Sequence, residues 1–157
     1  MVWKSLAWGS CEHSSREHTI MFAGVNYLAV VIAAIVAWIS GTVWYLAFGR
    51  AWIVALGLTP EKMEATNSFG FYLPFMLLFL ADLVIGWALA TLLAHLGAHS
   101  VRSGLIVAAL CWLGFVLSTM LVNNSFAKRD RRLIIMDGGH WLLVLLLMGA
   151  IIGAMRA

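Results

Sequence analysis

The sequence predicts an all-α, multi-pass membrane protein: a bundle of four transmembrane helices with a short interfacial segment after the first helix. Hydrophobic residues make up 63% of the 157 residues and charged residues only 11%, whereas soluble proteins contain roughly half and roughly a quarter. The chain also contains four apolar runs of more than twenty residues, each with at most one charge. Each run is long enough to cross a hydrocarbon core of about 30 Å.

The four runs are too long and too uniformly apolar to be barrel strands, and in lipid only a helix satisfies its backbone within one segment. We therefore expect a transmembrane domain over residues 21–157. Its predicted helices span Val25–Leu46, Phe71–Leu96, Leu105–Phe126 and Leu133–Met155.

Small residues recur every fourth position in the first two helices. Residues four apart share a helix face, and small ones let backbones approach closely in lipid. We therefore expect the first two helices to touch along these ridges, and the Gly149–Gly153 pair of the fourth helix to pack within the chain, with dimerisation as the alternative. The ridges are Ala29, Ala33, Ala37 and Gly41 in the first helix and Gly86, Ala90 and Ala94 in the second.

The first connection is long and mixes aromatic, basic and apolar residues over 48–60, which is typical of a segment lying at the lipid headgroups. Aromatic side chains cluster where the first helix should leave the bilayer, and an interfacial belt is their expected role. These are Trp44, Tyr45, Phe48 and Trp52.

Lysine and arginine in the loops predict the orientation, because cytoplasmic loops are enriched in them. Six lie on one side of the predicted membrane and four on the other, so we expect both termini outside and the Arg-rich third connection in the cytoplasm of a bacterial inner membrane. The six are Arg50, Lys62, Lys128, Arg129, Arg131 and Arg132, and the four are Lys4, Arg16, Arg102 and Arg156.

Residues 1–20 form a polar tail without the apolar stretch of a signal peptide, and the membrane pattern begins only after Met21. Two interpretations stay open: a genuine polar tail, or a chain that naturally starts at Met21.

Asp82 lies near the middle of the second predicted helix, close to the bilayer midplane. Its insertion costs roughly 3 kcal/mol, which the apolar residues of the run outweigh. Because Asp82 extends the ridge of Gly86, we expect it to face the bundle, where it needs a partner or a neutral form. It is either a proton-titrating or cation-binding carboxylate, or a protonated Asp bonded to a Ser, Thr or Asn of a neighbouring helix.

Asp137 and His140 are three residues apart near the start of the fourth helix, so they share a face. They form either a bonded structural pair or a proton relay. Asn123, at the end of the third helix, should lie on the same side of the membrane, where a polar pocket with Asp137 and His140 is expected. As an alternative, Asn123 serves only to hold helices together.

The sequence predicts no cofactor, metal site or catalytic residue, since it contains no phosphate-binding loop, dinucleotide fingerprint, nucleophile elbow or zinc-protease helix. The net charge of +3 comes from short loops between apolar runs, which favours lipid headgroups as the contact and gives no case for nucleic acid. The lipid bilayer is therefore the expected partner, together with a second copy or another membrane protein. A small-molecule substrate is not identified.

Several stretches are similar to those of a known family. The chain resembles the small bacterial membrane proteins catalogued as domain of unknown function 1761, over roughly Met21 to Arg156. The resemblance implies four spans in a bacterial membrane, and it brings neither an activity nor catalytic residues. The matching stretches are Asn26-Tyr27-Leu28-Ala29-Val30, Gly41-Thr42-Val43-Trp44-Tyr45, Phe48-Gly49-Arg50-Ala51-Trp52 with Gly57, Trp112-Leu113-Gly114-Phe115, Asn123-Asn124 and the region of His140.

Three functions follow as hypotheses. The first is a structural or accessory membrane component that associates with itself or a partner, as the packing ridges favour. The second is a small proton- or cation-coupled transporter, working as an oligomer, with Asp82 as the coupling carboxylate. The third is a membrane enzyme that uses Asp137 and His140.

Overall fold

A computed structural model describes residues 24–57 and 68–156 of the chain. The tail of residues 1–20 and residues 58–67 of the first connection lie outside this part. The helices are α2 (Tyr27–Leu56), α4 (Ser68–His95), α5 (Val101–Cys111), the π-helical segment η1 (Trp112–Leu117), α6 (Ser118–Phe126) and α7 (Arg131–Ala154).

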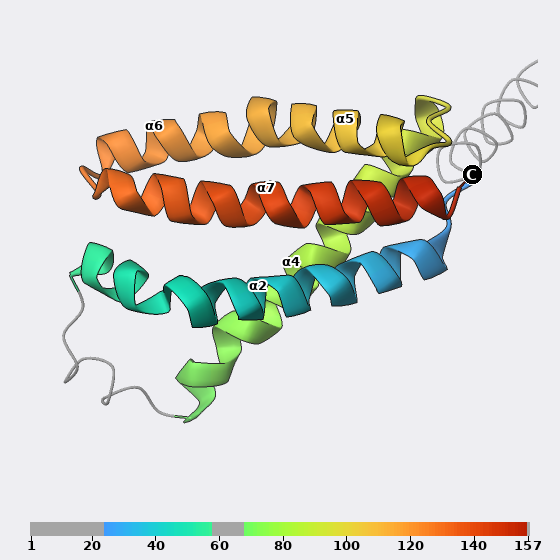
Figure 1. Ribbon diagram of the computed structural model, residues 1–157. Coiled ribbons are helices and arrows are strands. Elements are labelled where there is room, and N and C mark those ends of the chain that lie inside the picture. Colours follow the sequence, from blue (N-terminus) through green and yellow to red (C-terminus); the bar gives the residue numbers. More distant parts are fainter. Residues whose placement is uncertain (1–23, 58–67, 157) are drawn as a thin grey trace, which may run out of the picture.

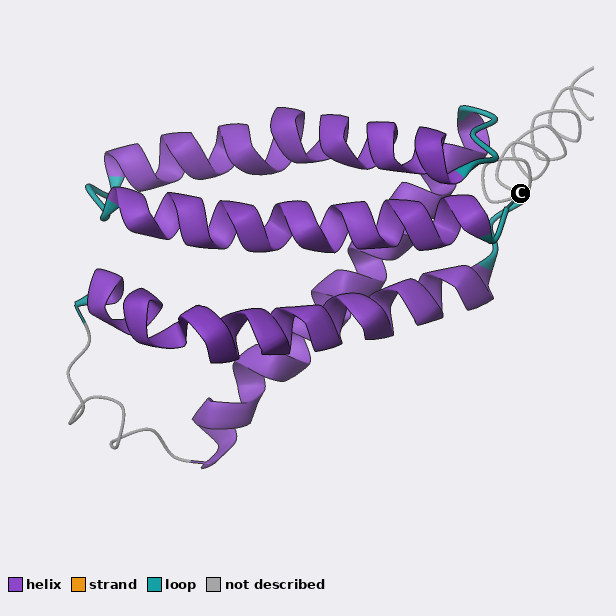
Figure 2. Ribbon diagram, in the orientation of Figure 1, coloured by secondary structure: helices purple, strands orange, loops and turns teal. Residues whose placement is uncertain are grey.

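Four helical rods are long and apolar enough to cross a membrane, because α5, η1 and α6 continue one another from Val101 to Phe126. The described residues form only helices and short turns (Figure 2). The predicted all-α fold with four spans is therefore confirmed.

Helix α7 lies between α2 and the α5–α6 rod and runs antiparallel to both, whereas α4 crosses them obliquely (Figure 1). The most extensive helix contacts are those that α7 makes with α5 and with α2. The fully buried side chains come mainly from α2, α4 and α7. The interior of the bundle is thus the space that these three helices enclose.

Glycines allow α5 and α7 to touch backbone to backbone. A Cβ on Gly104 would collide with the carbonyl oxygen of Gly149, and a Cβ on Gly153 would lie 2.5 Å from the carbonyl oxygen of Ser100. The expectation that the Gly149–Gly153 pair packs within the chain is confirmed, and α5 is its partner.

The ridge of α2 is buried along its length, but it faces two helices. A Cβ on Gly86 of α4 would lie 3.6 Å from Val30 Cγ1, so α2 and α4 do meet there. At the other end of the ridge, a Cβ on Gly41 would lie 2.8 Å from His140 Nε2 of α7. The same Cβ would lie 3.4 Å from Leu78 Cδ2 of α4, so the expected contact between the first two helices occurs at both ends of the ridge, and α7 shares the Gly41 end.

Helix α2 is longer than the sequence predicted. We expected it to end at Leu46 and an interfacial segment to follow, whereas the helix continues to Leu56 and ends where Gly57 adopts a left-handed conformation (φ 66°). No proline or glycine pair interrupts the helix before this residue, so the change from apolar to mixed composition does not break it. Its 30 residues span about 45 Å, more than the hydrocarbon thickness, so its last turns extend to the headgroup level.

Helices α5 and α7 start earlier than predicted, because polar side chains cap them. Asp130 accepts a hydrogen bond from the backbone of Arg132 at the start of α7. Ser100 and Ser103 form a reciprocal capping box at the start of α5. These caps satisfy N–H groups that have no partner within the helix.

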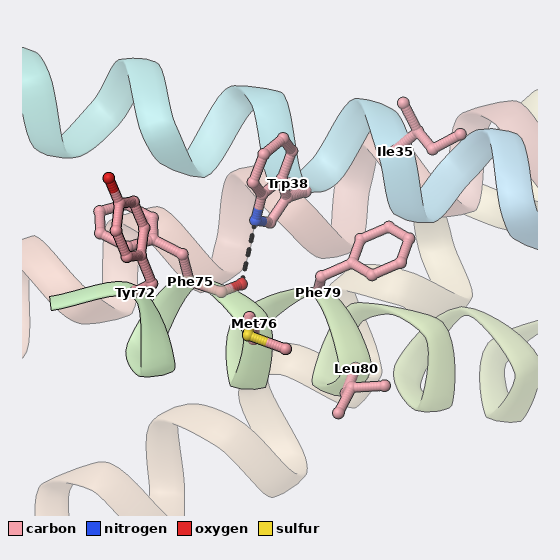
Figure 3. A pocket seen from close by; sticks show the side chains of 7 residues that line it. All are labelled: Ile35, Trp38, Tyr72, Phe75, Met76, Phe79 and Leu80. Carbon is pink, nitrogen blue, oxygen red and sulfur yellow. Dashed lines mark hydrogen bonds between the residues drawn. The ribbon is translucent and has the colours of Figure 1, made fainter. Parts of the chain in front are cut away.

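An apolar groove of about 500 Å³ opens between α2 and the first half of α4 (Figure 3). Across it, Trp38 Nε1 donates a hydrogen bond of 3.1 Å to the carbonyl oxygen of Phe75. The groove has no polar lining, so lipid tails are its natural surroundings. It is lined by Ile35, Trp38, Tyr72, Phe75, Met76, Phe79 and Leu80.

Candidate functional site

Asp82 points into the interior of the bundle from α4. Leu78, one turn before it, approaches Gly41 of α2, and Gly86, one turn after it, approaches Met148 of α7. Residues four apart share a helix face, and Asp82 itself is fully buried. The prediction that its side chain faces the bundle agrees with this placement.

Neither carboxyl oxygen of Asp82 has a hydrogen-bond partner among residues 24–57 and 68–156. A buried polar group without a partner costs several kcal/mol in an apolar surrounding, and an unpaired charge costs more. The Ser, Thr or Asn partner that a structural role requires is thus not supplied by the described part of the chain.

His140 is the second buried ionisable group, with 1% of its surface exposed. Gly41 leaves room for its imidazole, since any larger residue there would meet Nε2. Three aromatic rings surround it: those of Tyr45 and Trp141, with centroids 5.2 Å away, and that of Trp44 at 6.4 Å. Neither ring nitrogen has a hydrogen-bond partner within the described residues.

Asp82 and His140 lie at neighbouring levels of the same interior. Gly41 is in contact distance of both His140 and Leu78, and Leu78 precedes Asp82 by one turn, roughly 5.4 Å of helix. They are the only polar side chains classed as buried in the part of the chain that the structure describes. Within residues 24–57 and 68–156, the bundle interior therefore holds one acid and one base, and neither has a hydrogen-bond partner there.

Asp137 has a different environment, at the end of the bundle where α2, α6 and α7 meet. Its Oδ1 accepts hydrogen bonds from the Tyr45 hydroxyl (3.1 Å) and from Trp52 Nε1 (3.0 Å). A cavity of about 530 Å³ with mixed polar and apolar walls opens beside it. The cavity is lined by Tyr45, Trp52, Met120, Asn123, Asn124, Ala127, Arg129, Asp137 and Trp141.

Tyr45 connects the two environments. Its hydroxyl bonds to Asp137 in the cavity wall, and its ring lies against His140 in the interior. The polar groups thus form a series from the cavity inward: Asp137, Tyr45, His140 and then Asp82.

The family model described as "Protein of unknown function (DUF1761)" matches residues 28–153, which is most of the chain. The chain belongs to this family. No curated protein and no solved structure matches it. The DUF1761 match includes the whole series from Asp137 to Asp82, so these side chains lie within the family's domain.

In this DUF1761 protein the structure brings Asn123 and Asp137 together in one cavity wall, as the sequence suggested. His140 does not line that cavity, and no hydrogen bond joins it to Asp137. The two residues therefore lack the direct contact around an open pocket that a catalytic pair would need.

Sequence reasoning missed Tyr45 and Trp52 as parts of the site. Their position near the end of a span suggested an interfacial belt, whereas both side chains turn inward to Asp137. Their spacing could have indicated that they act together, because residues seven apart fall on one helix face. No group of three or more potential ligands that could hold a metal ion occurs within residues 24–57 and 68–156.

Proposed function

We propose that this DUF1761 protein is a small proton- or cation-coupled transporter in which Asp82 and His140 form the coupling site. One observation carries the proposal: an acid and a base are both buried between the same three helices, and neither has a partner in the described residues. Ionisable groups in such positions mark proton and ion pathways in membrane proteins.

The physical reason is that a purely structural role for Asp82 would reduce the stability of the bundle and gain nothing. A residue that only packs helices could be apolar, and a buried carboxyl without a hydrogen bond destabilises the bundle. A group that must gain and lose a proton cannot be replaced in this way. Tyr45 connects this interior to the cavity, because its ring lies against His140 and its hydroxyl donates a hydrogen bond to Asp137.

Infrared difference spectroscopy on the protein in lipid tests the proposal. Asp82→Asn identifies the carbonyl band of the protonated carboxyl. We expect this band to change reversibly with pH and to shift rapidly in D₂O, because a coupling carboxyl must exchange protons with water. Asp130→Asn is the matched control, since Asp130 is exposed at the start of α7 and asparagine caps a helix equally well.

A band that ignores both pH and D₂O would refute the coupling role of Asp82. The better description would then be a structural or accessory membrane component that assembles with itself or with a partner.

The proposed orientation places the cavity on the cytoplasmic side of a bacterial inner membrane and both termini outside. The turn between α6 and α7 carries Lys128 and Arg129, and α7 begins with Arg131 and Arg132. Cytoplasmic loops and the helix ends beside them are enriched in such residues. Alkaline phosphatase fused after Ala157 should be active, and a fluorescent protein fused there should stay dark. The opposite pair of results would invert the orientation.

A further inference from the structure

We infer that the cavity between α2, α6 and α7 binds a small zwitterionic amine, with its ammonium group on Asp137 and its anionic group towards Arg129. As a binding site the cavity stands on its own geometry. Its role as the solute site of a transporter rests on the function proposed above.

Asp137 is prepared as an acceptor for a cation. The hydrogen bonds from Tyr45 and Trp52 both end on Oδ1, which fixes the carboxylate against α2. No described residue donates a hydrogen bond to Oδ2, and the side chain is only half-buried in the cavity wall. One oxygen is therefore held and the other is available to a ligand.

The walls beside this carboxylate are aromatic. Tyr45, Trp52 and Trp141 line the cavity, and the rings of Tyr45 and Trp52 meet edge to face with centroids 5.6 Å apart. Aromatic faces attract ammonium groups, and tryptophan does so best. A carboxylate among aromatic rings thus favours an organic cation over a metal ion, which would need more oxygen ligands than this wall supplies.

Arg129 and the amide of Asn123 line the same cavity. Arg129 forms no ion pair within the described part of the chain, so its guanidinium is available to an anionic group. One negative and one positive side chain in a single cavity match a ligand that carries both charges, whereas a simple cation or anion meets repulsion from one of them. A volume of about 530 Å³ lies within the usual range for small-molecule sites.

Two sources can supply this chemistry: a free solute or the headgroup of an ethanolamine phospholipid. Asp137 lies six residues after the first residue of α7, about 9 Å along the helix. The site is thus near headgroup depth, and either source can reach it. The experiment below separates them.

Binding is measured by tryptophan fluorescence and calorimetry on the full chain in nanodiscs of phosphatidylglycerol, a lipid without an amine. The probes are O-phosphoethanolamine, ethanolamine and inorganic phosphate. We expect saturable binding that is tightest for O-phosphoethanolamine, and a loss of at least about tenfold in Asp137→Asn, because a charge-assisted hydrogen bond is removed.

Arg129→Gln is the second variant, and since the residue is exposed the fold should survive. It should abolish the preference for O-phosphoethanolamine over ethanolamine and leave the ethanolamine affinity unchanged or higher. The control Arg131→Gln, also exposed but outside the cavity, should behave as the natural protein does.

Nanodiscs that contain phosphatidylethanolamine distinguish the sources. If this lipid suppresses binding of the soluble probe, the headgroup occupies the cavity; if it does not, a free solute is the ligand. Either result supports the site. Absence of saturable binding in both nanodiscs, or equal binding by the natural protein and both cavity variants, would overturn it.

The two proposals fail separately. Binding that persists while the Asp82 band ignores pH would leave the cavity as a binding site without proton coupling. A titrating Asp82 without binding would keep the coupling site and remove the zwitterion.

Discussion

The backbone contact between α5 and α7 makes Gly104→Ala the sharpest test of the fold. A Cβ on Gly104 would collide with the carbonyl oxygen of Gly149, at a separation that real Cβ atoms do not show. It would also lie 2.9 Å from the carbonyl carbon of Gly149 and 3.5 Å from Gly153 Cα. The obstacle is backbone on both sides, so no side chain can rotate to make room. The two helices must separate.

The expected cost follows from that separation. Restoring an ordinary contact of 3.4 Å requires a displacement of more than about 1 Å, which forfeits at least about half of each dispersion contact across the interface. Overpacking costs about 1–3 kcal/mol, and a backbone obstacle favours the upper end. Alanine recovers up to about 1 kcal/mol in helix propensity. We therefore expect a net loss of about 2 kcal/mol.

Reversible unfolding in mixed micelles titrated with sodium dodecyl sulfate measures this loss. Gly49→Ala is the control, because Gly49 is also helical and a Cβ there meets nothing within 4 Å. It should match or slightly exceed the natural protein in stability. If Gly104→Ala unfolded at the same detergent fraction as Gly49→Ala, the close approach of α5 and α7 would be wrong.

Variants at three further positions probe other contacts by the same titration. Gly41→Ala would put a Cβ 2.8 Å from His140 Nε2 and should cost about 1–3 kcal/mol; an unchanged midpoint would show that the imidazole does not lie against α2. Trp112→Phe removes the 2.8 Å bond from Trp112 Nε1 to the Gly138 carbonyl oxygen and should cost about 1 kcal/mol, and no loss would mean that the bond contributes nothing. Gly97→Ala places a side chain at φ 62° and should lower the free energy of unfolding by about 1–2 kcal/mol. Gly97→Asn should lower it less, because asparagine adopts this conformation more readily. If asparagine were the more destabilising of the two, the left-handed turn would be contradicted.

The four spans were predictable because an apolar run of about twenty residues is stable in lipid only as a membrane-spanning helix. The sequence did not predict which helix packs against which face of another. The spacing of Gly149 and Gly153 identifies a face that permits close approach, but any helix with small residues can fill it. Only the assembled bundle shows that α5 fills it at Gly104.

The candidate site was predictable in its polar members and not in its connections. Asp82 and Asp137 stand out against an apolar background, so composition alone finds them. The donors to Asp137 come from α2, 85 and 92 residues away in the chain, and such pairings leave no local pattern. The hydrogen bond from Trp52 was harder to predict still, because the sequence predicted an interfacial segment after Leu46, whereas Trp52 belongs to α2, which continues to Leu56.

The π-helical segment of the third span has a consequence for how its two ends are oriented. A π turn holds one residue more than an α turn, and one residue corresponds to about 100° around a helix axis. If the same residues were wound as an α-helix throughout, Asn123 would turn by about 100° away from the cavity, whereas deleting one residue within Trp112–Leu117 would remove the π turn and leave Asn123 facing the cavity. The extra residue therefore sets the direction of α6 relative to α5, which glycine contact holds against α7.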